Sequence, residues 1–131
     1  MNELSVGVIG CGLRVRAMLP LILQNARGIP ARLAAVCDVK EKETLIDELK
    51  KIDIDCTNTR FYTDAEEMLS RERLDGVMIG TRCSLHTKYA VQVLEKGIPL
   101  FLEKPVATTQ SDWELLKKAY EDGDSEVVVS F

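Results

Sequence analysis

The chain has 131 residues, a length that suits one domain built around a single hydrophobic core. Apolar residues make up 46% and charged residues 29%, which is typical of a soluble globular protein, and the formal net charge of −4 without any run of Lys or Arg argues against a nucleic-acid partner. Because no apolar run reaches the roughly 20 residues of a membrane-spanning helix and the N-terminal strand lacks the features of a signal peptide, we expect no membrane attachment. The separated cysteines look like the reduced thiols of a cytoplasmic protein.

The cysteine and histidine content argues against a zinc site. The four cysteines are Cys11, Cys37, Cys56 and Cys83, none of them forms a Cys-x-x-Cys pair, and the chain has a single histidine. Structural zinc requires about four such ligands at close spacing. We therefore expect no metal and interpret the cysteines as reduced thiols.

The first expected element is an apolar strand that begins at Val6 and ends in a glycine turn. Gly10 permits a sharp turn out of the strand, and Gly12, which lacks a Cβ, lets the backbone approach a pyrophosphate. A helix expected over Leu13–Asn25 directs its N-terminus at that anion. Val15 replaces the third glycine of the Gly-x-Gly-x-x-Gly pattern of dinucleotide sites, so this motif alone is weak evidence.

The second expected strand, Ala31–Val36, comes shortly before Asp38. A carboxylate at the end of this strand can accept hydrogen bonds from the ribose hydroxyls of adenosine, and it would repel the 2′-phosphate of NADP. Asp38 could instead cap the following helix, which we expect over Lys40–Lys51. With the glycine turn in place we favour the ribose ligand, and with it NAD over NADP.

The remaining strands and helices alternate without hairpin signals. The expected strands are Arg60–Tyr62, Asp75–Gly80, Pro99–Leu102 and Glu126–Phe131. The expected helices are one capped by Thr63 with Glu66 that ends near Ser70, one over His86–Lys96, and one capped by Ser111 with Glu114 that ends near Glu121. Because such alternation requires right-handed crossovers, the sequence predicts an α/β fold, a doubly wound, mostly parallel six-stranded sheet with helices on both faces, in one domain over residues 1–131.

Polar clusters follow the fourth and fifth expected strands. Thr81, Arg82 and His86 come after the fourth strand, and Glu103 and Lys104 come after the fifth. Ligands of a parallel sheet bind at the carboxyl ends of its strands. We therefore expect both clusters to meet the glycine turn in one crevice.

The motifs of the second half are the more specific ones. Glu103-Lys104-Pro105 follows a glycine-stopped helix and the apolar strand within residues 97–102, and Ser84-Leu85-His86 stands one helix earlier. In this order, with the glycine turn and Asp38, nearly the whole chain resembles the glucose-fructose oxidoreductase, inositol dehydrogenase and MocA-like (Gfo/Idh/MocA) family. The resemblance implies the NAD-binding Rossmann domain of an oxidoreductase that acts on a sugar, polyol or related hydroxylated substrate.

The resemblance also implies a role for each site residue. The implied cofactor contacts are Gly10, Gly12, Leu13 and Arg14 at the pyrophosphate, Asp38 at the adenosine ribose, Thr81 and Arg82 at the nicotinamide ribose with His86 close by, and Glu103 at a ribose or its supporting groups. Lys104 would lie nearest to the chemistry and polarise a substrate hydroxyl or carbonyl during hydride transfer, with His86 as a second catalytic candidate. A solvent-facing lysine and a helix-capping histidine are the structural alternatives.

Three features depart from the family pattern. Val15 would hold the first helix away from its strand unless something compensates. Met18 stands where relatives often carry histidine, and Thr81-Arg82-Cys83-Ser84 replaces the commoner Ala-Thr-Pro-Asn. The cation that Arg82 adds could bind a phosphate, bind a carboxylate or lie in solvent.

A complete family member would continue into a substrate-binding domain, so we expect this chain to hold half of an active site and to be inactive alone. The apolar segment Val127–Val129 should lie on an edge strand, which favours a homo-oligomer or a covering partner. Three functions stay open: an NAD-dependent oxidoreductase, a non-catalytic NAD-binding or regulatory module, and a relative that uses NAD transiently in glycoside hydrolysis.

Overall fold

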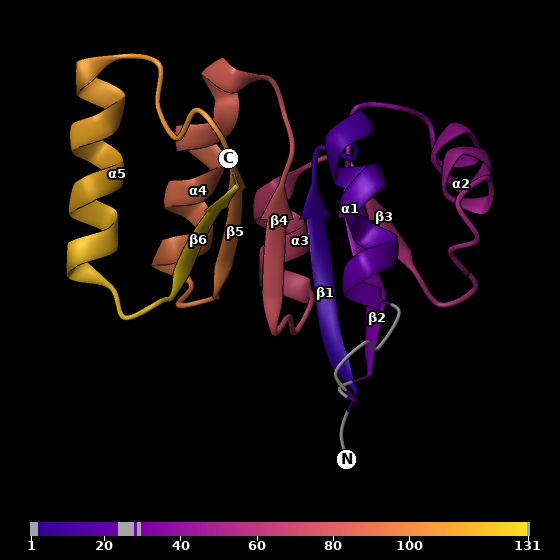
Figure 1. Ribbon diagram of the computed structural model, residues 1–131. Coiled ribbons are helices and arrows are strands. Elements are labelled where there is room, and N and C mark those ends of the chain that lie inside the picture. The colour runs from indigo at the N-terminus through magenta and orange to yellow at the C-terminus, as the bar shows by residue number, and fades with distance from the viewer. Residues whose placement is uncertain (1–2, 24–27, 29, 131) are drawn as a thin grey trace.

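All strands of the computed structural model, which describes residues 3–23, 28 and 30–130, lie in one sheet (Figure 1). The strands are β1 (Leu4–Ile9), β2 (Ala31–Cys37), β3 (Arg60–Tyr62), β4 (Gly76–Ile79), β5 (Leu100–Glu103) and β6 (Val127–Ser130). Their order is β3-β2-β1-β4-β5-β6, and every neighbouring pair is parallel. This order confirms the predicted doubly wound sheet, because the chain winds outward from β1 in one direction and from β4 in the other.

Helices cover both faces of the sheet. They are α1 (Leu13–Leu23), α2 (Lys42–Lys50), α3 (Ala65–Arg71), α4 (His86–Glu95) and α5 (Gln110–Asp122), with a short 3₁₀ turn, η1 (Cys83–Leu85), before α4. In Figure 1, α1 lies in front of β1 and β2, whereas α3 and α4 lie behind the sheet. The expected end of the first helix at Asn25 lies outside the described residues.

Alternation along the strands produces two apolar cores. Val8 packs with residues of α1 and α2, whereas the next residue, Ile9, packs with residues of α3, α4 and α5. Met78 and Ile79 of β4 divide between the two cores in the same way. Because the strands are covered on both faces, they read as continuous apolar runs in the sequence.

Gly80 compensates for the valine that replaces the third glycine. Val15 is buried, and its Cγ2 occupies the space that a Cβ on Gly80 would need. The close approach of helix and sheet that a glycine on α1 would permit therefore comes from a glycine at the end of β4. Met18, the other substitution on this helix, packs against the core that α1 shares with α2.

Two predicted helix caps are wrong. The N-cap residue of α3 is Asp64 and not Thr63, because the Asp64 Oδ1 accepts a hydrogen bond from the Glu66 amide at 3.2 Å. The N-cap residue of α5 is Thr109, whose Oγ1 accepts a hydrogen bond from the Asp112 amide at 3.0 Å, and Ser111 lies inside the helix. Each predicted pair has the spacing of a capping box, but in the structure a neighbouring side-chain oxygen makes the capping hydrogen bond instead.

β6 lies at one edge of the sheet, as its place in the sequence predicts. Its Val128 side chain is 57% exposed. Among the described residues, no helix is both long enough and apolar enough to cross a membrane.

Candidate cofactor-binding site

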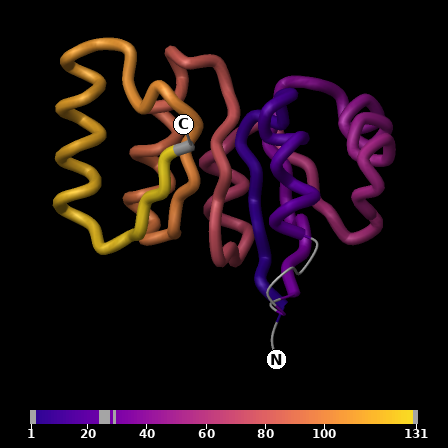
Figure 2. Tube along the Cα trace, in the orientation of Figure 1, coloured from indigo at the N-terminus to yellow at the C-terminus, as the bar shows by residue number. Residues whose placement is uncertain are grey.

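A cavity of about 350 Å³ opens at the carboxyl ends of β1, β2 and β4. The predicted residues that line it are Gly10, Gly12, Asp38, Thr81 and Arg82. β1 and β4 lie side by side although they are far apart in the sequence (Figure 2). The winding direction reverses between these two strands, which is where open α/β sheets bind their ligands.

The glycine turn is held in a conformation that side chains would obstruct. Gly10 has φ +79°, and a Cβ there would lie 2.7 Å from the backbone nitrogen of Thr81. A Cβ on Gly12 would lie 3.2 Å from the carbonyl oxygen of Gly80. The turn thus exposes bare backbone in front of α1, a surface suited to a pyrophosphate.

Asp38 connects the end of β2 to the glycine turn. Its Oδ2 accepts a hydrogen bond from the Cys11 amide at 2.8 Å, and its Oδ1 accepts one from the Lys40 amide at 2.9 Å. Glu41, and not Asp38, is the N-cap residue of α2. Because a carboxylate has about four acceptor positions, Asp38 retains capacity for hydroxyl donors in the cavity.

A buried carboxylate follows on β5. Glu103 is only 6% exposed, and its Oε2 lies 3.5 Å from the Nε of Arg14 at the start of α1. Its Oε1 is buried and accepts no hydrogen bond from any described residue. Arg14 and Glu103, predicted from separate motifs, therefore meet at the carboxyl end of β5, although neither lines the cavity.

His86 connects the two polar clusters. The ring is 2% exposed, with Nδ1 2.7 Å from the Pro105 carbonyl oxygen and Nε2 2.9 Å from the Thr81 carbonyl oxygen. The histidine thus ties the loop after β4 to the turn after β5, where the Lys104–Pro105 peptide bond is cis. Since backbone groups occupy both ring nitrogens, the geometry favours a positioning role for His86 over direct catalysis.

The remaining predicted residues are open to solvent. Lys104 directly follows β5 and is exposed, as is Arg82 at the cavity. Leu13, the first residue of α1, is 77% exposed and does not line the cavity. Any cofactor contact at Leu13 would therefore come from its backbone at the helix N-terminus.

Several cavity residues were not predicted. They are Ile9, Cys11, Cys37, Val39, Lys40, Thr63, Gly80, Leu85 and Tyr89. Val39 directly follows Asp38 and is 94% exposed, so an apolar side chain stands free beside the expected adenosine position. The sequence could have indicated that Val39 lines the cavity, because it directly follows Asp38, which was predicted to contact the ligand at the end of this strand.

The two cysteines at the cavity are poor nucleophiles. Burial, and next to it the Asp38 carboxylate, raises the pKa of Cys11 to about 12. Burial and the same carboxylate raise the pKa of Cys37 to about 11. Both groups are therefore neutral thiols near pH 7.

Curated relatives of the chain are carbohydrate and cyclitol enzymes by name. It is 30% identical over 124 residues to 2,7-anhydro-N-acetylneuraminate hydratase of Mediterraneibacter gnavus, covering 94% of this chain and 30% of that protein. It is 27% identical over 106 residues to inositol 2-dehydrogenase 2 of Saccharopolyspora erythraea, covering 81% of this chain and 29% of that protein. The chain thus spans about 30% of the length of these relatives.

Solved structures and family membership agree with the fold. The WlbA dehydrogenase from Bordetella pertussis, solved in complex with NADH and UDP-GlcNAcA, has a TM-score of 0.75 at 25% identity, covering 98% of this chain and 37% of that one. Residues 4–131 match the family described as an oxidoreductase family with an NAD-binding Rossmann fold. The chain therefore belongs to the Gfo/Idh/MocA oxidoreductases and forms their NAD-binding Rossmann domain.

Proposed function

We propose that the chain binds NAD in this cavity, in preference to NADP, and forms the cofactor half of an oxidoreductase. The observation that carries the proposal is the position of Asp38, which the Cys11 amide fixes against the glycine turn. Its free lone pairs suit the two ribose hydroxyls, and its charge would repel a 2′-phosphate. Glu103 does not line the cavity, so in this proposal it supports the site through its ion pair with Arg14 at the start of α1.

Bound NAD would supply the hydride acceptor or donor. In this proposal Lys104, which directly follows Glu103, donates a hydrogen bond to the substrate oxygen. The Lys104 ammonium would stabilise negative charge on this oxygen. The names of the relatives point to sugars and cyclitols, so we infer a sugar, polyol or related hydroxylated ring as substrate, held with the help of residues beyond this domain.

Calorimetric titration with NAD and with NADP tests the cofactor assignment. We expect NAD to bind and NADP to bind more weakly, and equal affinity for the two would overturn the preference. Adding a panel of polyols and sugars to the full-length protein with NAD then tests the reaction through the ultraviolet absorbance of NADH. A protein that binds NAD tightly and turns over none of them would be a binding or regulatory module.

A second candidate is a reaction without net oxidation. The hydratase of Mediterraneibacter gnavus favours it, because its name describes the addition or removal of water. Such an enzyme would use NAD only transiently, so product would form without accumulation of NADH. Product analysis beside the absorbance measurement distinguishes the two candidates.

We also propose that the protein works in the cytoplasm and associates through β6. The buried thiols of Cys11 and Cys37 suit a reducing compartment. The exposed Val128 on an edge strand favours pairing with a second chain, either another copy or a covering partner.

A further inference from the structure

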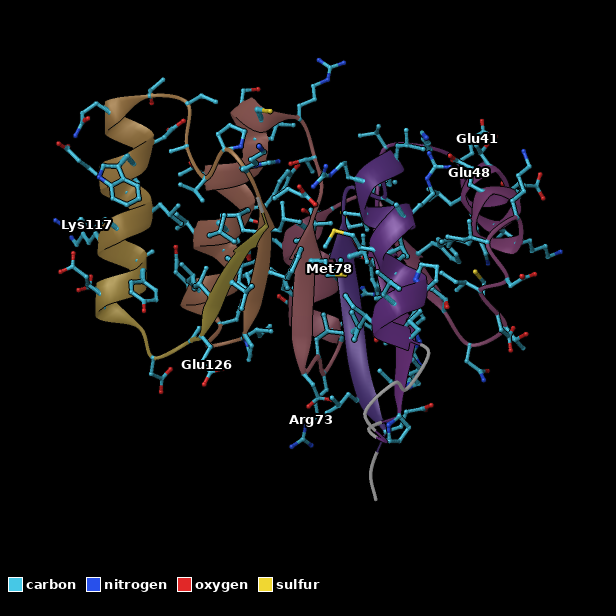
Figure 3. All side chains as sticks on the ribbon, in the orientation of Figure 1. Glu41, Glu48, Arg73, Met78, Lys117 and Glu126 are labelled. Atoms are coloured by element: carbon cyan, nitrogen blue, oxygen red, sulfur yellow. The ribbon has the colours of Figure 1, made fainter. Side chains whose placement is uncertain are left out.

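Two cations stand beside Asp38, and both are held by one glutamate from α2. The Arg16 guanidinium, in the first turns of α1, forms a close ion pair with the Glu48 Oε2. The Lys40 ammonium lies 3.1 Å from Oε1 and 3.2 Å from Oε2 of the same carboxylate. Glu48 reaches them from the side of α2 that faces α1 (Figure 3).

This network lies at the adenosine end of the cavity. Lys40 lines the cavity, and its backbone amide binds Asp38. Arg16 also directs its Nε to the Gly12 carbonyl oxygen at 3.4 Å, so it borders the glycine turn. Asp38 accepts a hydrogen bond from the Cys11 amide, and the charges of Arg16, Glu48 and Lys40 also act on the Cys11 thiol, so the network lies within electrostatic range of the Asp38 position.

The ion pairs are partly shielded from water. The exposed fractions of the side chains are 16% for Glu48, 20% for Arg16 and 43% for Lys40. Shielded, hydrogen-bonded charge pairs are stronger than fully exposed ones. The two carboxylates and two cations of this network sum to zero charge, so among these four described residues neither cation is left uncompensated for a dianion.

We propose that Glu48 is a specificity-determining residue for the cofactor. By holding Arg16 and Lys40, it withholds the cations that a 2′-phosphate needs, and so it adds to the repulsion by Asp38. The inference rests on the proposed binding of NAD. Its consequence is that cofactor choice depends on α2 as well as on the acid at the end of β2.

The variant Glu48→Gln tests the inference, because it keeps the side-chain shape and removes the charge that holds the cations. We expect the affinity for NADP to rise about five- to tenfold relative to that for NAD, the range for one or two partly screened charge pairs. Glu41→Gln is the matched control, since Glu41 is an exposed residue at the start of the same helix and forms no side-chain cap (Figure 3). It removes the same charge without releasing either cation, so the ratio should stay unchanged.

Calorimetry with NAD and NADP on the unmodified chain and the variants separates the outcomes. If the unmodified chain binds neither dinucleotide, the proposed function fails. If it binds NAD but Glu48→Gln changes both affinities by one common factor, or Glu41→Gln shifts the ratio equally, the proposed role of Glu48 fails. Adding Lys40→Met to Glu48→Gln should cancel part of the gain in NADP affinity.

The single variant Lys40→Met tests the same inference should Glu48→Gln fold poorly. While Glu48 holds Lys40, loss of the ammonium should leave the weak binding of NADP unchanged. A several-fold further loss of NADP affinity would show that Lys40 already contacts the phosphate, and this would overturn the inference.

Discussion

Asp38 holds the glycine turn and, in our proposal, the adenosine ribose, so its removal should affect both folding and binding. Asp38→Ala removes two hydrogen bonds to backbone amides, and we expect the free energy of unfolding to fall by about 1–3 kcal/mol. NAD affinity should fall about tenfold, as for one lost charge-assisted contact, while NADP binding gains relative to it. Thermal melts and calorimetry measure the two effects.

Asp75 offers a control for this prediction. Its Oδ2 accepts a hydrogen bond from the Ser5 amide at 2.8 Å, near the amino ends of β1 and β4 and so at the opposite end of these strands from the cavity. Asp75→Ala should lower stability through the same kind of lost contact and leave the affinity for NAD unchanged. An equal loss of affinity in both variants would mean that Asp38 acts only through stability.

Replacing Glu103 should affect stability differently from replacing Asp38, although both changes should weaken NAD binding. Glu103→Gln removes a buried charge whose partner, the Arg14 side chain, is 63% exposed, so stability should stay within about 1 kcal/mol or rise. NAD affinity should fall several-fold, because the neutral amide no longer holds the Arg14 side chain at the start of α1, beside the proposed pyrophosphate position. The stabilisation of the chain by saturating NAD would therefore shrink, and melts with and without NAD would show it. Unchanged affinity would remove Glu103 from the proposed site.

The buried thiols make stability depend on alkaline pH. The pKa of Cys11 rises from 9.0 to about 12 on folding, so the unfolded chain loses this proton first. The stabilising effect is complete below pH 9 and is lost as the pH rises toward 12, by about 1.4 kcal/mol per pH unit. Urea unfolding between pH 8 and 10.5 measures how the free energy of unfolding changes with pH. Cys11→Ala should reduce the slope but not remove it, because Cys37 also has a raised pKa, whereas Cys83→Ser, at an exposed position, should leave the slope unchanged.

At the scale of whole elements, the strands are predictable because both faces of the sheet are covered. Val77, Met78 and Ile79 are all buried, so β4 reads as an uninterrupted apolar run. Helix starts are less predictable, since Thr63 and Asp64 are both suitable caps and only the backbone geometry selects Asp64. Parallel topology also places the glycine turn, Asp38 and Glu103 at the carboxyl ends of the strands, which is why the sequence predicts that these groups lie near one another, whereas most of the residues that line the cavity were not predicted.

Contacts between elements are what the sequence does not show. Nothing in the local pattern around Glu48 indicates that it pairs with Arg16, which is 32 residues away on another helix. The roles of Val15 and Gly80 are equally hidden, because each looks like an unremarkable position until the helix and the strand meet. Contacts of this kind depend on how closely two elements pack, and the hydrophobic periodicity of the sequence does not indicate that distance.

The pair of Val15 and Gly80 therefore supports a prediction at this scale. Gly80→Ala places a Cβ against Val15 and 2.8 Å from the Gly10 carbonyl oxygen, so we expect a loss of about 2–3 kcal/mol in unfolding free energy. Adding Val15→Ala should recover part of this loss in a double-mutant cycle. Gly76→Ala is the control, because its Cβ would lie 3.8 Å from the Pro99 carbonyl oxygen, an ordinary contact. Additive losses would show that α1 and β4 do not compete for this space.

At the scale of the whole molecule, the two sheet edges differ in how they are used. β3 is short and pairs with β2, on the side of the sheet where Asp38 follows β2. β6 pairs with β5 over four residues and leaves its outer side unpaired among the described residues. Every hydrogen-bonding group on that side must bind water or another chain.

We predict that the chain associates through β6 in a concentration-dependent way. Val128→Lys places a charge on the edge strand, where it opposes strand pairing, and should shift the protein toward monomer in light scattering coupled to size exclusion. Leu115→Lys is a matched control, because Leu115 on α5 is 58% exposed against 57% for Val128, yet a helix offers no unpaired strand backbone. If both variants dissociate the protein equally, general hydrophobicity drives association, and a monomer at all concentrations would show that β6 pairs with nothing. The expected result, loss of association for Val128→Lys alone, would place the contact on the strand edge itself, at the opposite side of the sheet from the adenosine end of the cofactor cavity.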